Sequence, residues 1–179
     1  TAGVRKIGKM ENDIEFYGFV RAKRSISRAD VVLFMIDSTV PISQVDKSLA
    51  KLIEEEYKTC ILVVNKWDLA KDVASTEDYQ DYLTKVLPGL KFAPIAFTTA
   101  TESKNIQSVL DLAAELYKQA TTQIPTPKLN KAFDIIKEER GGSARTKKGR
   151  PKFYYVAQIA VNPITLLMFV NKPELFEDS

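Results

Sequence analysis

Apolar residues gather in three short runs over the first 100 residues of the chain. The first two runs are too continuously apolar for half-exposed strands, and they are typical of strands in a parallel sheet that is covered on both faces. The predicted strands are residues 30–37 ("DVVLFMID"), 59–64 ("TCILVV") and 93–100 ("APIAFTTA").

Segments with helical periodicity lie between and beside these runs. Residues 105–120 predict a helix whose apolar face carries Ile106, Val109, Leu110, Ala113, Leu116 and Tyr117. The other predicted helices are 11–29, 43–57 with Ser43 as its N-cap, and 76–87. Alternating strands and helices predict an α/β fold with a parallel sheet, in which ligands bind beyond the carboxyl ends of the strands.

The pattern changes after residue 122. Pro125 and Pro127 interrupt helical continuity, so we expect a linker at 123–127 between one domain at 1–122 and a second at 128–179. The second part predicts a helix at 128–139, a Gly-rich basic stretch, and two strands, 153–161 and 165–171. A hairpin beside one helix is too small for a robust independent core, which indicates an incomplete α+β domain.

Composition narrows the class of protein. Apolar residues make up 45% and charged residues 27% of the 179 residues, as in an ordinary soluble globular protein, and no apolar run is long enough to span a bilayer. The single cysteine, Cys60, fits a reducing cytoplasm. The chain has no histidine, which excludes His-based acid–base catalysis and His-ligated zinc within it. A net charge of +3 is modest, so nucleic-acid binding has to be argued from local clusters.

The polar segment "NKWD" follows the second predicted strand directly. Guanine presents a ring N–H beside an exocyclic amine, and the carboxylate of Asp68 can accept both in parallel hydrogen bonds. Adenine lacks that pair of donors and would leave the charge unpaired. Asn65 can donate to ring acceptors and tie neighbouring loops together, whereas Lys66 can lay its stem over the base while its ammonium reaches loop carbonyls. Trp67 faces outward or packs under the site.

Other interpretations of this segment stay open. It can be an ordinary polar turn, and an unrelated flavodoxin-like domain would use the same strand ends for another ligand. A further alternative is an RNA- or protein-docking module without nucleotide chemistry. Asp30 and Asp37, which bracket the first predicted strand, are interpreted as polar residues at the ends of that strand.

Taken together, five segments resemble the second G domain and part of the KH-like domain of the Der (EngA) family, the double-Era-like bacterial GTPases. They are "TAGVRKIGK", "SRADVVLFMID", "VVNKWDL", "FAPIAFTTA" and "KFYYVAQIAVNPITLLMFVN". The resemblance implies a P-loop-NTPase-like G domain that binds GTP and GDP, hydrolyses GTP with magnesium, and acts in late assembly of the large ribosomal subunit. It further implies rRNA and a companion G domain as partners, and a cytoplasmic location.

The resemblance also assigns site residues. Thr99 and Ala100 match a Ser-Ala pair whose alanine N–H contacts the guanine oxygen. Thr1, Ala2 and Gly3 match the end of an Asp-Thr-Ala-Gly motif on the phosphate side, and the magnesium-linked Asp would precede Thr1, so no metal ligand is expected within the chain. Val4 stands where many signalling GTPases place a water-orienting Gln, so the hydrolytic water would need another positioning device.

The phosphate-binding sequence G-x-x-x-x-G-K-[ST] does not occur in the chain. In a G domain that loop and the first switch precede the position of Thr1, and the chain does not begin with Met. We therefore expect a truncated G domain that lacks its P-loop part, with the guanine half of the pocket present. Taken alone, such a fragment should be inactive as an enzyme.

A basic stretch precedes the predicted hairpin and is a candidate for RNA contact. Aromatic residues 153–155 follow it and can stack on bases. A solvated loop followed by a strand with core aromatics is the alternative, because the G-x-x-G clamp of KH domains is not evident. Another basic cluster lies on the predicted helix 11–29, where a solvated face is again the alternative. The basic stretch comprises Arg145, Lys147, Lys148, Arg150 and Lys152, and the helix cluster comprises Arg21, Lys23, Arg24 and Arg28.

Overall fold

The computed structural model describes residues 13–139 and 152–175, in two units that divide between Gln119 and Ala120. The phosphate-side and basic-loop residues predicted from the sequence lie outside the described residues, with the exception of Lys152. They are Thr1, Ala2, Gly3, Val4, Arg145, Lys147, Lys148 and Arg150.

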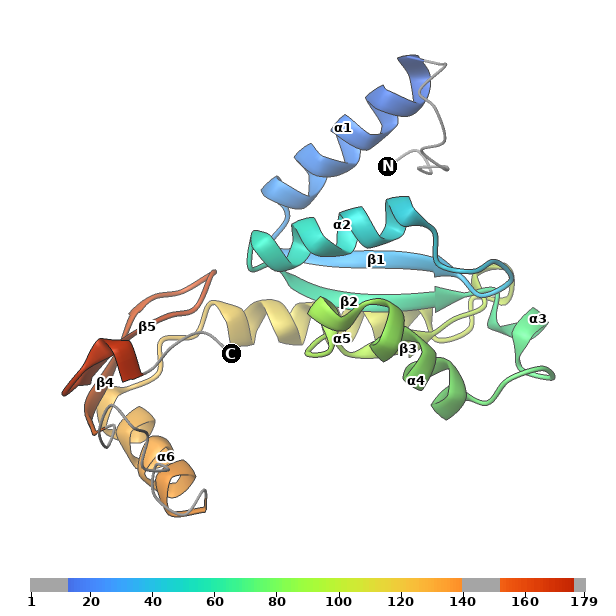
Figure 1. The fold of residues 1–179 in the computed structure, drawn as a ribbon. Coiled ribbons are helices and arrows are strands. Elements are labelled where there is room, and N and C mark those ends of the chain that lie inside the picture. Colours follow the sequence, from blue (N-terminus) through green and yellow to red (C-terminus); the bar gives the residue numbers. More distant parts are fainter. Residues whose placement is uncertain (1–12, 140–151, 176–179) are drawn as a thin grey trace. The chain divides into compact units, whose positions relative to one another are not determined.

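The first unit is built on a three-stranded parallel sheet (Figure 1). Its strands are β1 (Val31–Asp37), β2 (Thr59–Asn65) and β3 (Ile95–Phe97), in the spatial order β1-β2-β3. The register of the first pair sets Asp37 beside Asn65, so the carboxyl ends of β1 and β2 lie next to each other. The predicted parallel α/β fold is confirmed.

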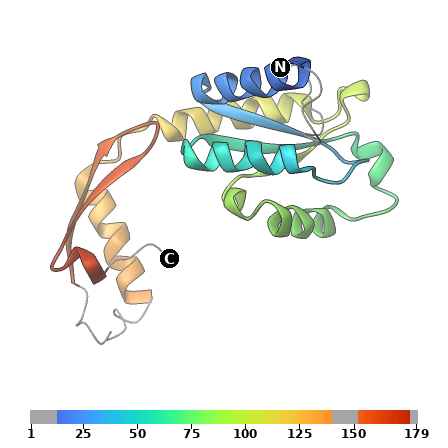
Figure 2. The ribbon, with the colours of Figure 1, turned by 45° about the horizontal axis from the view of Figure 1, so that its top comes forward.

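Helices cover both faces of this sheet, and α2 and α5 lie on opposite sides of the strands (Figures 1 and 2). Side chains of α1, α2 and α4 pack with Phe34, Leu62 and Val64 in the larger core, whereas α5 packs on Ile61 and Val63. The helices are α1 (Asp13–Arg28), α2 (Gln44–Glu55), α3 (Trp67–Ala70), α4 (Thr76–Val86) and α5 (Ile106–Ala120), with short 3-10 turns η1 (Pro88–Leu90) and η2 (Ala100–Glu102).

Local hydrogen bonds explain where two of these helices begin. Ser43 is the N-cap of α2, as predicted: its side chain accepts from the Asp46 backbone N–H, and the Asp46 carboxylate accepts from the Ser43 backbone N–H. Ser75 and Asp78 repeat this capping box at the start of α4. Each box satisfies two of the N–H groups that a helix start leaves without an intrahelical partner.

Two predictions about burial are wrong. β1 is half-exposed in the part of the chain that the structure describes, because Leu33 and Met35 on the α5 side are 39% and 55% exposed. The cause is that α5 packs over the middle and far strands and leaves this edge strand uncovered. On α5, Leu110 is 51% and Tyr117 is 47% exposed, whereas Leu112 joins Val109, Ala113 and Leu116 against the sheet. The face of α5 that contacts the sheet is therefore narrower than the predicted apolar face.

The second unit pairs one helix with an antiparallel hairpin. Its elements are α6 (Thr126–Glu139), β4 (Phe153–Ala160), β5 (Thr165–Val170) and the turn η3 (Pro173–Leu175). α6 begins before the predicted helix start at 128, so Pro127 lies in its first turn, where the missing N–H costs nothing. Phe133 of α6 stacks on Phe153 with ring centroids 5.0 Å apart, which joins the helix to β4.

No helix within the described ranges is both long and apolar enough to cross a membrane.

Candidate functional site

The turn after β2 has an unusual backbone conformation. Lys66, directly after the strand, adopts φ 60° and ψ 33°, and α3 begins at the next residue, Trp67. A left-handed conformation is uncommon for a residue with a Cβ and costs about 1–2 kcal/mol, and such strain concentrates at functional sites. The strand end, the strained lysine and the short helix together set the directions of the four "NKWD" side chains.

Asn65 connects this turn to the loop that follows β3. Its Oδ1 accepts hydrogen bonds from the Ala100 backbone N–H at 3.0 Å and from the Thr98 hydroxyl at 3.2 Å. The Trp67 backbone N–H donates to the Thr98 carbonyl at 3.1 Å, which makes a third link between the two loops. The structure therefore brings together the "NKWD" turn and the "TTA" segment, two regions that the sequence singled out separately.

The two residues matched to the Ser-Ala pair play different roles. Thr99 is buried, and its backbone pairs with Lys104 across a tight turn. Ala100 is exposed, and its N–H, which the resemblance directs at a guanine oxygen, donates here to Asn65. The N–H therefore lies at the mouth of the turn, already oriented by the asparagine side chain.

Trp67 packs beneath the turn, and the prediction that it faces outward or packs under the site resolves to the second option. Its ring centroid lies 4.4 Å from that of Phe97 and 5.5 Å from that of Tyr79. Tyr79 lies edge-on to Tyr82 in the same cluster. These aromatic contacts fix the turn to β3 and α4, so the polar residues around Trp67 rest on a rigid base.

Asp68 lies in the first turn of α3 and is half-buried. No described residue donates a hydrogen bond to the Asp68 carboxylate, and none forms an ion pair with it. The Nδ2 amide of Asn65 likewise has no acceptor among the described residues. The turn thus presents a two-oxygen acceptor and an amide donor, which is a set suited to the edge of a purine.

A further acidic residue, Asp37, forms an ion pair with this turn. Asp37 Oδ2 lies 2.6 Å from the Lys66 ammonium, and this contact, with hydrogen bonds from Thr39, lowers the pKa of Asp37 to about 2. The predicted contact of Lys66 with loop carbonyls is therefore replaced by an ion pair. The sequence analysis did not assign this role to Asp37, because the contact depends on the register of β1 against β2 and on the left-handed conformation of Lys66.

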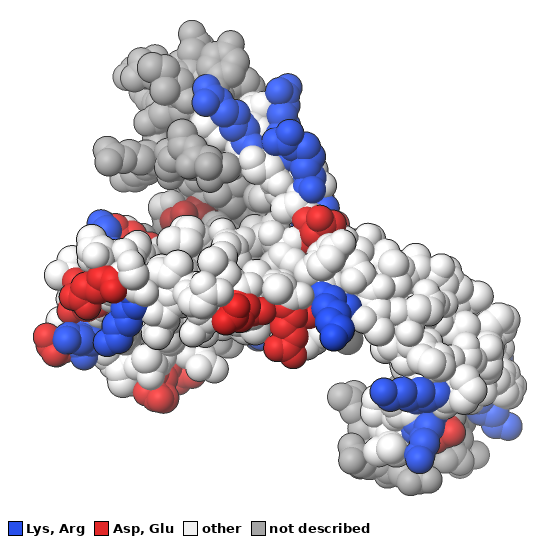
Figure 3. Space-filling model, turned by 180° about the vertical axis from the view of Figure 1, so that it is seen from behind, with Lys and Arg blue, Asp and Glu red and all other residues white. Residues whose placement is uncertain are grey.

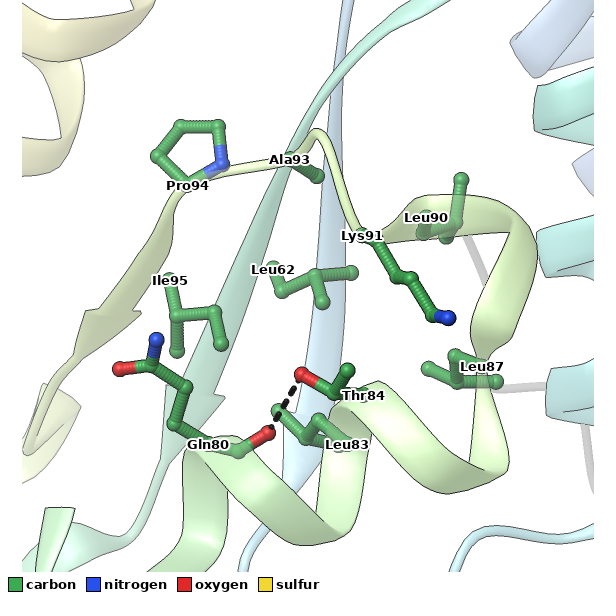
Figure 4. Close-up of a pocket in the computed structure, with 10 residues that line it drawn as sticks. All are labelled: Leu62, Gln80, Leu83, Thr84, Leu87, Leu90, Lys91, Ala93, Pro94 and Ile95. Atoms are coloured by element: carbon green, nitrogen blue, oxygen red, sulfur yellow. Dashed lines mark hydrogen bonds between the residues drawn. The ribbon is translucent and has the colours of Figure 1, made fainter. Parts of the chain in front are cut away.

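A cavity of about 150 Å³ opens elsewhere in the first unit, beside α4 (Figure 4). Most of its lining residues are aliphatic, but Gln80, Thr84 and Lys91 also line it, and the Thr84 hydroxyl donates to the Gln80 carbonyl of the same helix. None of the residues predicted to bind a nucleotide lines it. The lining residues are Leu62, Gln80, Leu83, Thr84, Leu87, Leu90, Lys91, Ala93, Pro94 and Ile95.

Candidate RNA-contacting residues occur in both units. Cationic side chains gather along α1 in Figure 3, where Arg21, Lys23, Arg24 and Arg28 are all exposed. In the second unit Lys152 is exposed, and Tyr154 on β4 is 64% exposed. Phe153 is half-buried against α6 instead, so only Tyr154 and Tyr155 of the predicted stacking group are exposed.

The described residues do not form a metal site: no group of three or more His, Cys, Asp or Glu side chains there could hold an ion. Residues 13–139 and 152–175 thus offer no ligand set for the magnesium that the resemblance implies.

Comparisons with known proteins agree with this architecture. The family model "50S ribosome-binding GTPase" matches residues 1–66, and the model "KH-domain-like of EngA bacterial GTPase enzymes, C-terminal" matches residues 123–179. Among solved structures, Aquifex aeolicus Era bound to GDP·AlF4⁻ aligns with a TM-score of 0.50 and 26% identity, over 63% of this chain and 36% of Era. The fold is that of a P-loop GTPase-like α/β domain followed by a KH-like module.

Curated relatives give a finer assignment. The chain is 38% identical over 174 residues to GTPase Der of Rhodopirellula baltica, which covers 97% of this chain and 38% of that protein. It is 36% identical over 183 residues to GTPase Der of Fusobacterium nucleatum, covering 100% of this chain and 41% of that protein. The chain is therefore related to the Der (EngA) GTPases along nearly its whole length, and it spans about two fifths of the length of these relatives.

Proposed function

We propose that this chain carries the guanine-recognising part of a GTPase, which binds GTP and GDP and hydrolyses GTP to GDP and phosphate. The observation that carries the proposal is the hydrogen bonding between the turn after β2 and the loop after β3. Asn65 fastens the loop of Ala100, while the neighbouring Asp68 carboxylate has no donor among the described residues. Such a carboxylate accepts the ring N–H and the exocyclic amine of guanine together.

Each residue of the turn has its own role in this proposal. The Asn65 amide donates to a ring acceptor of the base, and the Lys66 stem lies over the base plane. Trp67 supports the turn from below through Phe97 and Tyr79. Ala100 lies in the loop that Asn65 holds and offers its backbone N–H to the guanine oxygen, with Thr99 anchoring the loop.

The phosphate side of the pocket is assigned to residues outside this site. Thr1, Ala2 and Gly3 are proposed to approach the terminal phosphate, as implied by their match to the end of the Asp-Thr-Ala-Gly motif, and Val4 follows them at the position where many signalling GTPases place a water-orienting Gln. Magnesium would be held by groups other than the described residues of this chain, and it would neutralise phosphate charge when bound. Residues 1–122 then act as the G domain and 128–179 as a KH-like module, and the last two residues of the predicted linker 123–127 already belong to α6.

A nucleotide titration tests the proposal. The full-length protein is titrated with GDP and with ADP, each carrying the same fluorescent label, and dissociation constants are compared at one salt concentration. Because adenine leaves the Asp68 charge unpaired, we expect GDP to bind at least about 100-fold more tightly. Equal affinities, or no binding of either nucleotide, would contradict the proposal that this site recognises guanine.

The cellular role proposed is late assembly of the large ribosomal subunit in the cytoplasm, with rRNA and a companion G domain as partners. Support comes from the match to the 50S ribosome-binding GTPase family and from the exposed Lys152 and Tyr154. Phosphate contacts make RNA affinity fall steeply with salt, so loss of cations should reduce both the affinity and the salt slope. If salt-dependent rRNA binding survives replacement of Lys147 and Lys148, the basic loop is not its source.

A further inference from the structure

Asp37 and Ser38, at the end of β1, contact Asn65 and Lys66, at the end of β2. Ser38 donates its backbone N–H to the Asn65 carbonyl at 3.0 Å and its hydroxyl to the Lys66 carbonyl at 2.9 Å. Asp37 holds the ammonium of the same lysine at 2.6 Å. Lys66 is therefore fixed at its backbone and at the far end of its side chain, from a neighbouring strand that supplies no residue to the proposed guanine contacts.

The Asp37 carboxylate is itself held in place. Its Oδ1 accepts from the Thr39 backbone N–H at 2.9 Å and from the Thr39 hydroxyl at 2.6 Å, so only Oδ2 is directed at the lysine. Hydrogen bonding from Lys66, followed by that from Thr39, lowers the pKa of Asp37 to about 2, so the carboxylate is ionised throughout the physiological range. Among the described residues, no second carboxylate lies within ion-pair distance of the Lys66 ammonium.

A lysine side chain loses rotamer freedom when it is ordered. A lysine that is already anchored at both ends does not lose this freedom again when a ligand packs against its stem, and such preorganisation strengthens binding. The pair is partly exposed, with the Lys66 and Asp37 side chains 51% and 33% accessible. An exposed ion pair adds little to fold stability, so stability alone does not account for this arrangement.

We propose that Asp37 is a positioning residue of the guanine site, which acts through Lys66 by holding its side chain extended along the turn where a purine face would lie. This inference rests on the proposed function, because it assumes that a guanine base packs on the Lys66 stem. Ser38 assists by holding the left-handed backbone of the lysine. Asp37 itself does not contact the base.

A double-mutant cycle tests the proposal in the full-length protein with labelled GDP. Asp37→Asn keeps the shape of the side chain and the acceptor for Thr39 but removes the charge, so folding should be preserved, and a melting curve checks this. We expect GDP affinity to fall about three- to tenfold, as estimated for one mobile side chain that must be ordered on binding. In a Lys66→Met background the same change should have no further effect, because the group through which Asp37 acts is gone.

Glu55→Gln is the matched control, because it also removes one negative charge from an exposed pair with a lysine, Lys51, on the outer surface of α2. It should leave GDP affinity unchanged. If Asp37→Asn binds GDP like the parent protein, or if its effect adds fully to that of Lys66→Met, the positioning role is wrong. If the parent protein itself fails to prefer GDP over ADP, the proposed function is wrong instead, so the two failures are distinguishable.

Discussion

At the scale of single residues, the aromatic base of the turn contains one polar atom without a described partner. The Tyr79 hydroxyl is buried beside Trp67, and no described residue forms a hydrogen bond with it. Burial raises the pKa of Tyr79 above its ordinary value, so the phenol stays neutral at physiological pH. Its neighbour Tyr82, in contrast, accepts a hydrogen bond from the Ile42 backbone N–H at 3.0 Å.

This difference predicts opposite outcomes for two matched substitutions. Tyr79→Phe should leave the free energy of unfolding unchanged or raise it by about 1 kcal/mol, because it removes a desolvated hydroxyl. Tyr82→Phe should lower the free energy of unfolding by about 1 kcal/mol, because it leaves the Ile42 N–H without its partner. Urea unfolding measures both. A loss at Tyr79 as large as that at Tyr82 would show that its hydroxyl has a partner.

Cys60 gives a second prediction at this scale. It is 1% exposed in β2, and burial raises the pKa of its thiol to about 12. Since the thiolate is the reactive form, native protein should not react with iodoacetamide at pH 8, whereas protein unfolded in guanidinium should react fully. Mass spectrometry of the labelled protein reports both states. Rapid labelling of native protein would mean that β2 opens readily or is not buried as described.

At the scale of elements, a side chain completes the pairing of one edge of the hairpin. Asn130 of α6 donates its amide to the Val156 carbonyl at 2.8 Å and accepts from the Val156 N–H at 3.0 Å. These two bonds imitate those of a neighbouring strand along β4. Gln158, two residues after Val156 in β4, is also buried. Its side-chain oxygen accepts a hydrogen bond from the Ile124 backbone N–H at 2.8 Å, which connects the segment before α6 to β4.

Asn130→Ala should therefore destabilise the second unit by about 1–3 kcal/mol, because two buried backbone groups of Val156 lose their partners. Hydrogen exchange should become faster at the Val156 amide. Asn171→Ala is a suitable comparison, since Asn171 bonds an exposed backbone N–H, that of Lys152, and should have a smaller effect. Unchanged protection at Val156 in the Asn130 variant would contradict this account.

The helices and strands also indicate which features of the fold can be predicted from the sequence alone. The buried strand β2 and the capped helix α2 were predictable, because a continuous apolar run and a Ser N-cap are local signals. The exposed face of β1 was not, because coverage depends on which helix lies over which strand. Nor was the pairing of Asp37 with Lys66, since it depends on strand register and on a left-handed lysine that no local pattern encodes.

At the scale of the whole molecule, the candidate chemistry is concentrated in the first unit. The turn after β2, the loop after β3 and the loop after β1 meet at the carboxyl ends of three parallel strands, where α/β sheets bind ligands. The second unit carries an exposed cation and an exposed aromatic residue on or beside β4, which suit contact with a nucleic acid. We therefore propose that the first unit recognises the nucleotide and that the second unit contributes to RNA contact.

The most direct test of the central claim replaces one carboxylate oxygen of Asp68 with an amide NH2 group. In the full-length protein, Asp68→Asn places a donor where guanine also donates and where xanthine accepts, so preference should move from GDP to XDP. Asp72→Asn, a neighbouring exposed carboxylate, serves as the control and should keep the preference for GDP. Dissociation constants for both nucleotides decide the matter: a reversed ratio only in the Asp68 variant is the predicted result, and an unchanged preference for GDP in that variant would contradict it.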